Sequence, residues 1–154
     1  MAVNRDFKDL FYTLNEFRVR YLVVGAHAVI HYTEPRYTRD LDIWVQPTAA
    51  NAKATWKALV QFGAPLRNVK EADFKNPELI LQIGIAPNRV DIMTAVSGVR
   101  FNTAWRSAVR TTYGGERIRI IGFKDLVRAK RAAARPQDFL DLAALEALKR
   151  PRRG

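Results

Sequence analysis

The sequence predicts an α+β domain, with a small mixed α/β sheet flanked by helices. Two observations carry this prediction. Short apolar, β-branched runs alternate with amphipathic segments in the order strand, helix, strand, helix, strand, strand. Helical periodicity then dominates the C-terminal part of the chain, after a run whose Gly114-Gly115 pair is typical of a hairpin turn. This order favours a sheet that carries helices over an all-helical bundle or an all-β sandwich.

Each expected element rests on its periodicity and on the residues at its ends. In chain order, the expected elements are a helix at 4–19, a strand at 21–25, a helix at 26–33, a strand at 41–46, a helix at 49–63, strands at 78–84 and 88–94, a helix at 101–109, a hairpin at 110–121, and helices at 123–134 and 136–149. Asn4 is a plausible N-cap, Thr48 opens the long third helix, and Gly63 ends it.

Length and composition predict one domain. The 154 residues are 48% hydrophobic, which is enough for one core, so we expect a single domain over 1–149 and a mobile basic tail over 150–154. There is no cysteine, which excludes disulfides and thiolate metal sites. No apolar run approaches the roughly 20 residues of a membrane span, and the N-terminus lacks a signal-peptide core. We therefore expect a cytoplasmic protein.

Basic residues are concentrated in the second part of the chain. The formal net charge is +11, and residues 89–154 hold 15 basic and 6 acidic residues against 11 and 9 in residues 1–88. Such an excess indicates a polyanionic partner, with a highly charged soluble surface as the alternative.

Three aspartates interrupt apolar strands. Asp40 and Asp42 alternate with apolar residues, so they share one face of their strand, and Asp91 lies between valine and isoleucine in a later strand. Like charges in such positions are unfavourable unless a cation neutralises them, and Mg²⁺ prefers oxygen ligands of this kind. Sites that hold two metal ions for phosphoryl transfer use such aspartates.

Ion pairing is the alternative reading of these acids. They would then cap helices or pair with arginines close to them in the sequence, which are Arg36, Arg39 and Arg89.

The order of the motifs resembles a known superfamily. The segments "YLVVGAHAV", "RYTRDLDIWV", "RVDIMTAVSGVRF" and "KRAAARPQDFLDLAALE" together resemble the nucleotidyltransferase superfamily of the polymerase-β type. More narrowly, they are similar to the bacterial AbiEii/AbiGii toxin group and its single-domain relatives. The resemblance runs from about Val19 to Glu146. It implies the nucleotidyltransferase fold and an enzyme of the EC 2.7.7 type.

The resemblance also implies a role for each matched residue. Asp40, Asp42 and Asp91 would be catalytic and would hold Mg²⁺ or Mn²⁺, with Asp91 close to the acceptor hydroxyl. The implied nucleotide-binding residues are Gly25, Ala26, Arg36, Thr38, Lys130, Arg135 and Asp138. Ala26 stands where a serine is common in the superfamily, so backbone amides would replace its hydroxyl. The alternative interpretation of Lys130, Arg135 and Asp138 is a solvated basic helix, followed by a helix with an acidic first turn.

The substrate is a nucleoside triphosphate (NTP) under this reading, and the acceptor is a hydroxyl group. We expect RNA, including a tRNA end, because the basic part of the chain can neutralise phosphates. A toxin–antitoxin or phage-defence role with a cognate antitoxin protein follows from the narrower resemblance. The alternatives are a non-catalytic module of the same fold that binds a nucleotide or a partner, and a transferase acting on a small molecule or a protein.

Overall fold

The computed structural model describes residues 3–149 apart from 35–37 and 85–87. The predicted tail at 150–154 therefore lies outside the described residues. The elements in chain order are α1 (Arg5–Glu16), β1 (Tyr21–Val24), α2 (Gly25–Tyr32), β2 (Asp40–Val45), α3 (Ala49–Phe62), the 3₁₀ helix η1 (Glu71–Lys75), β3 (Ile80–Ile83), β4 (Arg89–Met93), α4 (Phe101–Arg106), β5 (Val109–Tyr113), β6 (Glu116–Ile120), α5 (Phe123–Ala133) and α6 (Pro136–Lys149).

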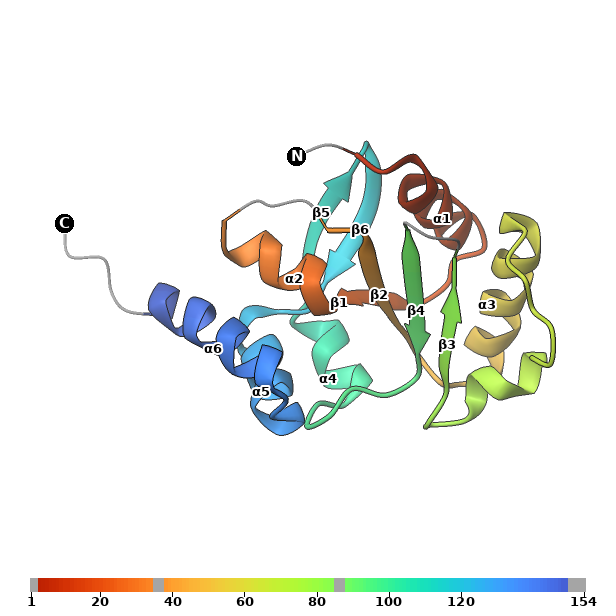
Figure 1. Cartoon of the computed structure of the whole chain (residues 1–154). Helices are drawn as coiled ribbons and strands as arrows, with labels where there is room; N and C mark the ends of the chain where they lie inside the picture. Colours follow the sequence, from red (N-terminus) through yellow and green to blue (C-terminus); the bar gives the residue numbers. More distant parts are fainter. Residues whose placement is uncertain (1–2, 35–37, 85–87, 150–154) are drawn as a thin grey trace.

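A mixed six-stranded sheet forms the centre of the molecule (Figure 1). Its strand order is β3-β4-β2-β1-β6-β5. Strand β1 is antiparallel to β2 and parallel to β6, while β2 is parallel to β4. The two outer pairs, β3 with β4 and β5 with β6, are antiparallel. The predicted mixed α/β class is confirmed.

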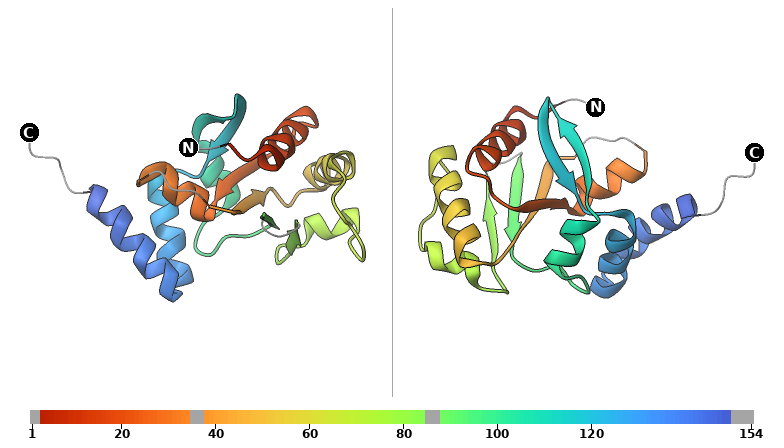
Figure 2. Two further views of the ribbon diagram at one scale, coloured as in Figure 1. Left: turned by 45° about the horizontal axis from the view of Figure 1, so that its top comes forward. Right: turned by 180° about the vertical axis from the view of Figure 1, so that it is seen from behind.

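The two sheet faces are covered by different helices. Tyr21 of β1 stacks on Phe11 of α1, whereas Trp44 of β2 meets the edge of Phe101 in α4. Tyr21 lies opposite Val45, so it points away from the face of Trp44. Figure 2 shows α1 and α3 side by side, with α5 and α6 grouped away from them. Strands β2 and β4 lie between these groups.

The predicted helix ends are largely confirmed. The side chain of Asn4 accepts hydrogen bonds from the backbone N–H groups of Asp6 and Phe7, and Thr48 caps α3 in the same way. Gly63 ends α3 in the left-handed region with a φ of 90°, where a glycine has no steric penalty.

Two local predictions are wrong. The helix predicted at 101–109 ends at Arg106, and Val109 begins β5, because it pairs with Ile120 across the hairpin. Strand pairing has overridden local helix propensity here. The segment after α3 contains η1, which was not predicted, and its Phe74 is fully buried. Burial of this one aromatic ring anchors the segment against the core.

No helix in the described part of the chain is long and apolar enough to cross a membrane.

The entry into β1 depends on one buried amide side chain. Asn51, near the start of α3, accepts a hydrogen bond from the backbone N–H of Arg20 at 2.7 Å and donates to the Arg20 carbonyl at 3.0 Å. It also donates to the carbonyl of Gln46 at 2.9 Å. Asn51 therefore ties the segment before β1 to the segment after β2.

We expect Asn51→Ala to lower the free energy of unfolding by about 2–3 kcal/mol, because it removes three hydrogen bonds and takes from the Arg20 backbone N–H the acceptor that it has in this structure. Thermal and urea unfolding measure this change. The matched control is Lys53→Ala, an exposed residue of the same helix, which should change stability by less than about 0.5 kcal/mol. Equal stability of the two variants would contradict this role for Asn51.

Candidate active site

Two carboxylates lie side by side where β2 and β4 pair. Asp42 and Asp91 are register partners in this parallel pair, so their side chains project from the same face at the same level. Both residues are half-buried. Asp40 precedes Asp42 by two residues and shares its face, but Asp40 is exposed, at the first position of β2. The structure therefore brings all three predicted aspartates to one region, with Asp40 at its rim.

Gly25 lies directly against Asp42. A Cβ atom at Gly25 would come within 1.9 Å of a carboxylate oxygen of Asp42, and the φ of Gly25 is +66°, in the left-handed region. Both the close approach and the backbone conformation therefore require glycine. Gly25 is also the first residue of α2, whose N-cap residue Val24 provides no side-chain cap. The free N–H groups of this first turn, including those of Gly25 and Ala26, can serve an anion.

The electrostatic environment of Asp42 opposes its ionised form. Burial, with the charges of Asp91 and Asp40 added, raises the pKa of Asp42 to about 6, although Lys130 and Arg89 oppose the rise. A neighbouring negative charge disfavours the ionised form of a carboxyl group, so Asp91 and Asp40 add to the effect of burial on the pKa of Asp42. A divalent cation placed among these oxygens would reverse the shift, because it stabilises the ionised form.

Arg89 provides the present counter-charge to Asp91. Its guanidinium lies 3.3 Å from the carboxylate, forming the ion pair that was the alternative reading of this acid. Arg89 is exposed, so this pair is open to solvent and exchangeable. Within the described residues, no three acidic or histidine side chains converge closely enough to hold a metal ion together. The aspartates fit Mg²⁺ in donor chemistry and in strand register, and Arg89 would have to release Asp91 for the set to close.

The other predicted residues before β2 are placed less completely. Thr38 precedes the strand, and its hydroxyl accepts a hydrogen bond from the Asp40 backbone N–H at 3.2 Å. It therefore supports the start of β2. Arg36 lies outside the described residues.

The corner between α5 and α6 carries a buried charge network. Lys130 lies 3.2 Å from Asp138 and 3.0 Å from Asp141, and all three residues are buried. Arg135 donates to Asp138 from its backbone N–H and from its guanidinium, at 3.0 Å and 2.8 Å. Burial alone would raise the pKa of Asp138, but the hydrogen bonds from Arg135 and Lys130 outweigh it and lower the pKa to about 2.

This network faces the aspartates. The charges of Lys130 and Arg135 both interact with Asp42, which places the corner within electrostatic reach of the candidate site. Asp138 is fully buried and its oxygens are already occupied, so it acts through Lys130 and Arg135 in this conformation. The side chain of Arg135 is 72% exposed and can still meet a ligand.

Asp141 is the member of this network that was not predicted as a site residue. The signal was available, because the spacing of Asp138 and Asp141 places both on one face of a helix. Their shared partner Lys130 lies on the preceding helix, which only the fold brings close.

No protein-family model matches the chain, and no curated protein shows significant sequence similarity to it. Solved structures do resemble it. The lincosamide antibiotic adenylyltransferase LnuA, solved with lincomycin bound, matches with a TM-score of 0.58 and 17% identity over 96% of this chain and 99% of LnuA. The antibiotic-resistance factor ANT(2'')-Ia matches with a TM-score of 0.59 and 10% identity over 94% of this chain and 87% of its own.

A third structure, TM1012 from Thermotoga maritima, is a provisionally assigned nucleotidyltransferase. It matches with a TM-score of 0.53 and 15% identity over 94% of this chain and 87% of its own. The chain therefore has the nucleotidyltransferase fold, as its sequence predicts. The narrower AbiEii/AbiGii grouping stays a prediction from sequence.

The raised pKa of Asp42 predicts a stability that depends on pH. The ionised carboxylate is penalised in the folded state above pH 6, and the penalty disappears as pH falls toward the ordinary pKa of 3.8. Asp42→Asn should therefore be more stable than the wild type by about 2–3 kcal/mol at pH 7, with the difference vanishing near pH 4.

Urea unfolding of both proteins between pH 4 and 8 measures this difference. Asp9→Asn, an exposed carboxylate of α1, is the matched control and should show no such trend. A lower stability of Asp42→Asn at pH 7 would contradict the electrostatic account of the site.

Proposed function

We propose that this protein is a metal-dependent nucleotidyltransferase, which moves a nucleoside monophosphate from an NTP to a hydroxyl acceptor. The observation that carries the proposal is the pairing of Asp42 with Asp91 directly beside Gly25 at the start of α2. This arrangement combines adjacent carboxylates with free helix N–H groups, and the two together suit a metal-bound triphosphate. The nucleotidyltransferase fold supports it.

Each residue has a proposed role in the transfer. Asp40, Asp42 and Asp91 would hold Mg²⁺ or Mn²⁺, which when bound neutralises charge on the triphosphate. The amides of Gly25 and Ala26 would donate hydrogen bonds to phosphate oxygens. Asp91 would accept the proton of the acceptor hydroxyl, whose oxygen then bonds to the α-phosphorus while the bond to pyrophosphate breaks.

The α5–α6 corner would hold the triphosphate from the other side. Arg135 is exposed and presents a planar guanidinium, which suits phosphate recognition. Lys130 adds a positive charge near Asp42, although Asp138 and Asp141 already share it. Asp138 would orient both cations. Arg36 and Thr38 complete the proposed nucleotide-binding set from the segment before β2.

We propose RNA, including a tRNA end, as the acceptor. The net charge of +11 supports it, because a nucleotide alone does not require so large an excess. A small-molecule acceptor is the second candidate, favoured by the likeness to LnuA, which is an antibiotic adenylyltransferase. A toxin role, an antitoxin partner and a cytoplasmic location rest on the sequence alone.

Incubation with each of the four α-labelled NTPs, with and without Mg²⁺, tests the proposal. One arm contains total bacterial RNA and the other a panel of lincosamides and aminoglycosides. We expect Mg²⁺-dependent label in the RNA arm. Label only in the second arm would replace RNA by a small acceptor, and an NTP-induced rise in melting temperature without any transfer would favour a non-catalytic binding module.

We expect Asp40→Asn, Asp42→Asn and Asp91→Asn each to reduce transfer by at least about 100-fold, because each removes a ligand or the general base. The initial rate of label incorporation measures this loss. Glu78→Gln, an exposed carboxylate outside the site, should retain the wild-type rate. Wild-type activity in Asp91→Asn would remove the proposed base.

A further inference from the structure

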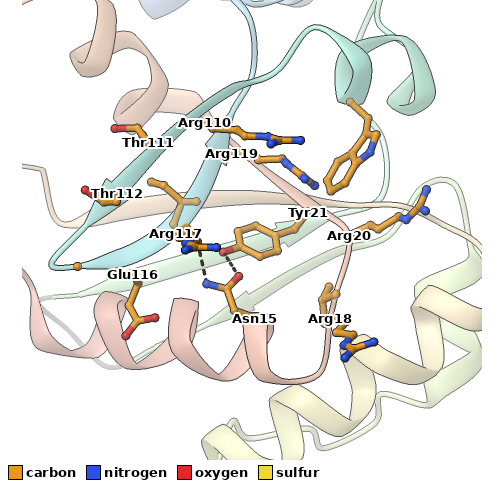
Figure 3. A pocket seen from close by; sticks show the side chains of 14 residues that line it. Asn15, Arg18, Arg20, Tyr21, Arg110, Thr111, Thr112, Glu116, Arg117 and Arg119 are labelled. Carbon is orange, nitrogen blue, oxygen red and sulfur yellow. Dashed lines mark hydrogen bonds between the residues drawn. The ribbon is translucent and has the colours of Figure 1, made fainter.

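A second charged site lies at the start of β1, away from the aspartates. A cavity of about 920 Å³ opens between the segment that joins α1 to β1, the β5–β6 hairpin and the end of α4. We call this cavity the arginine notch. Five arginines line it, namely Arg18, Arg20, Arg110, Arg117 and Arg119 (Figure 3).

Strand register concentrates these charges. Arg110 of β5 lies directly opposite Arg119 of β6, and alternation places Arg117 on the same face of the hairpin. Like charges at directly opposed positions of an antiparallel pair are destabilising. Burial, together with Arg110 and Arg20, lowers the pKa of Arg119, as expected where positive charges crowd one another.

In the part of the chain that the structure describes, no acidic side chain forms an ion pair with an arginine of the notch. Among the residues that the structure describes, none of the five guanidiniums forms an ion pair or a side-chain hydrogen bond. Glu116 lines the cavity, but Figure 3 shows it apart from Arg110 and Arg119. Other arginines of the chain do have partners, for example Arg128 with Asp125. The notch therefore presents uncompensated positive charge that suits an anion.

An aromatic support fixes one of these guanidiniums. Arg119 lies 3.9 Å from the ring centroid of Trp105, and Arg20 lies 5.6 Å from it. Phe101 stacks with the same indole at 5.8 Å. Because Trp105 is already engaged by Arg119 and Phe101, the notch suits recognition of phosphate charge more than base stacking.

Arg119 of the notch and Asp42 project from the same face of the sheet, whereas Tyr21, which also lines the notch, projects from the other face. Val23 pairs with both Ile43 and Ile120, so these three side chains lie on one face. Asp42 directly precedes Ile43, and Arg119 directly precedes Ile120. Both therefore project from the opposite face.

The two sites lie at opposite ends of β1. This strand has four residues, so about 13 Å of strand separates the notch from Gly25. One triphosphate does not occupy both sites, whereas a chain of several nucleotides can reach from one to the other. The charge pattern and this spacing favour a polymeric ligand.

We propose that the arginine notch binds the phosphodiester backbone of RNA and holds the acceptor while its end lies at the aspartates. This inference rests on the proposed RNA acceptor and adds the surface at which the protein binds that RNA. Each guanidinium contacts a phosphate, and the contacts carry no base specificity.

The test is equilibrium binding of a labelled, mixed-sequence single-stranded RNA over a range of salt concentrations, without NTP. The test variant combines Arg18→Gln, Arg110→Gln and Arg117→Gln, which leaves Arg119 on Trp105. The matched control removes the same charge from exposed positions on and after α3 that do not line the notch, which are Lys57→Gln, Arg67→Gln and Lys75→Gln.

We expect the notch variant to bind RNA about 100-fold more weakly at 0.1 M salt, with a log–log salt slope smaller by about 2, while the control binds nearly as the wild type. Each single notch substitution should weaken RNA binding about fivefold. These single variants test the proposal if the triple variant does not fold. Equal losses in both triple variants would overturn the proposal, because the charges would then act only through net charge. Unchanged RNA binding by the notch variant would also overturn the proposal. The arginines would then serve to prevent the edge strand β5 from pairing with another chain.

Two further arms separate this inference from others. A poly-glutamate peptide serves as a probe for acidic proteins. If the notch variant binds this peptide more weakly than the wild type does but binds RNA equally well, the notch would be assigned to a protein partner and the proposal would be overturned. The transfer assay on the same preparations is the second arm. Failure of transfer with intact, notch-dependent RNA binding would contradict the proposed catalysis and leave the notch standing.

Discussion

The central constraint on this structure is that two carboxylates, those of Asp42 and Asp91, lie at the same level of two parallel strands. The partial burial of Asp42, together with the charges of Asp91 and Asp40, raises the pKa of Asp42 to about 6. The first turn of α2 lies against the same carboxylate, and this close approach is possible because Gly25 has no side chain. Such an arrangement favours a cation at the carboxylates and an anion at the helix, and a metal-bound triphosphate supplies both.

The surrounding cations compensate this repulsion only in part. Arg89 pairs with Asp91 from the solvent side, and the exposed position of this pair makes it weak. Lys130 reaches Asp42 electrostatically, but its ammonium group is bound to Asp138 and Asp141. Breaking one member of this buried network would leave unpaired charge behind, so it holds the α5–α6 corner in place. The corner can therefore position Arg135 without closing the site to a ligand.

Local signals in the sequence predicted the elements that carry the site. Alternation of aspartates with apolar residues marked β2, and Asn4 marked the start of α1. Long-range pairing accounts for what was missed. Val109 joins a strand because Ile120 lies opposite it, which local propensity does not reveal. The arginine notch is a stronger case, because only the parallel pairing of β1 with β6 brings residues near 18–20 to the hairpin at 109–120.

The most direct test of this account is an NMR titration of the Asp42 carboxyl carbon, recorded without metal and again with Mg²⁺ and a non-hydrolysable NTP analogue. We expect a pKa near 6 for Asp42 in the metal-free protein. In the complex this pKa should fall below about 4, because the bound cation stabilises the carboxylate. An ordinary pKa without metal, or a raised pKa that Mg²⁺ and nucleotide leave unchanged, would contradict it.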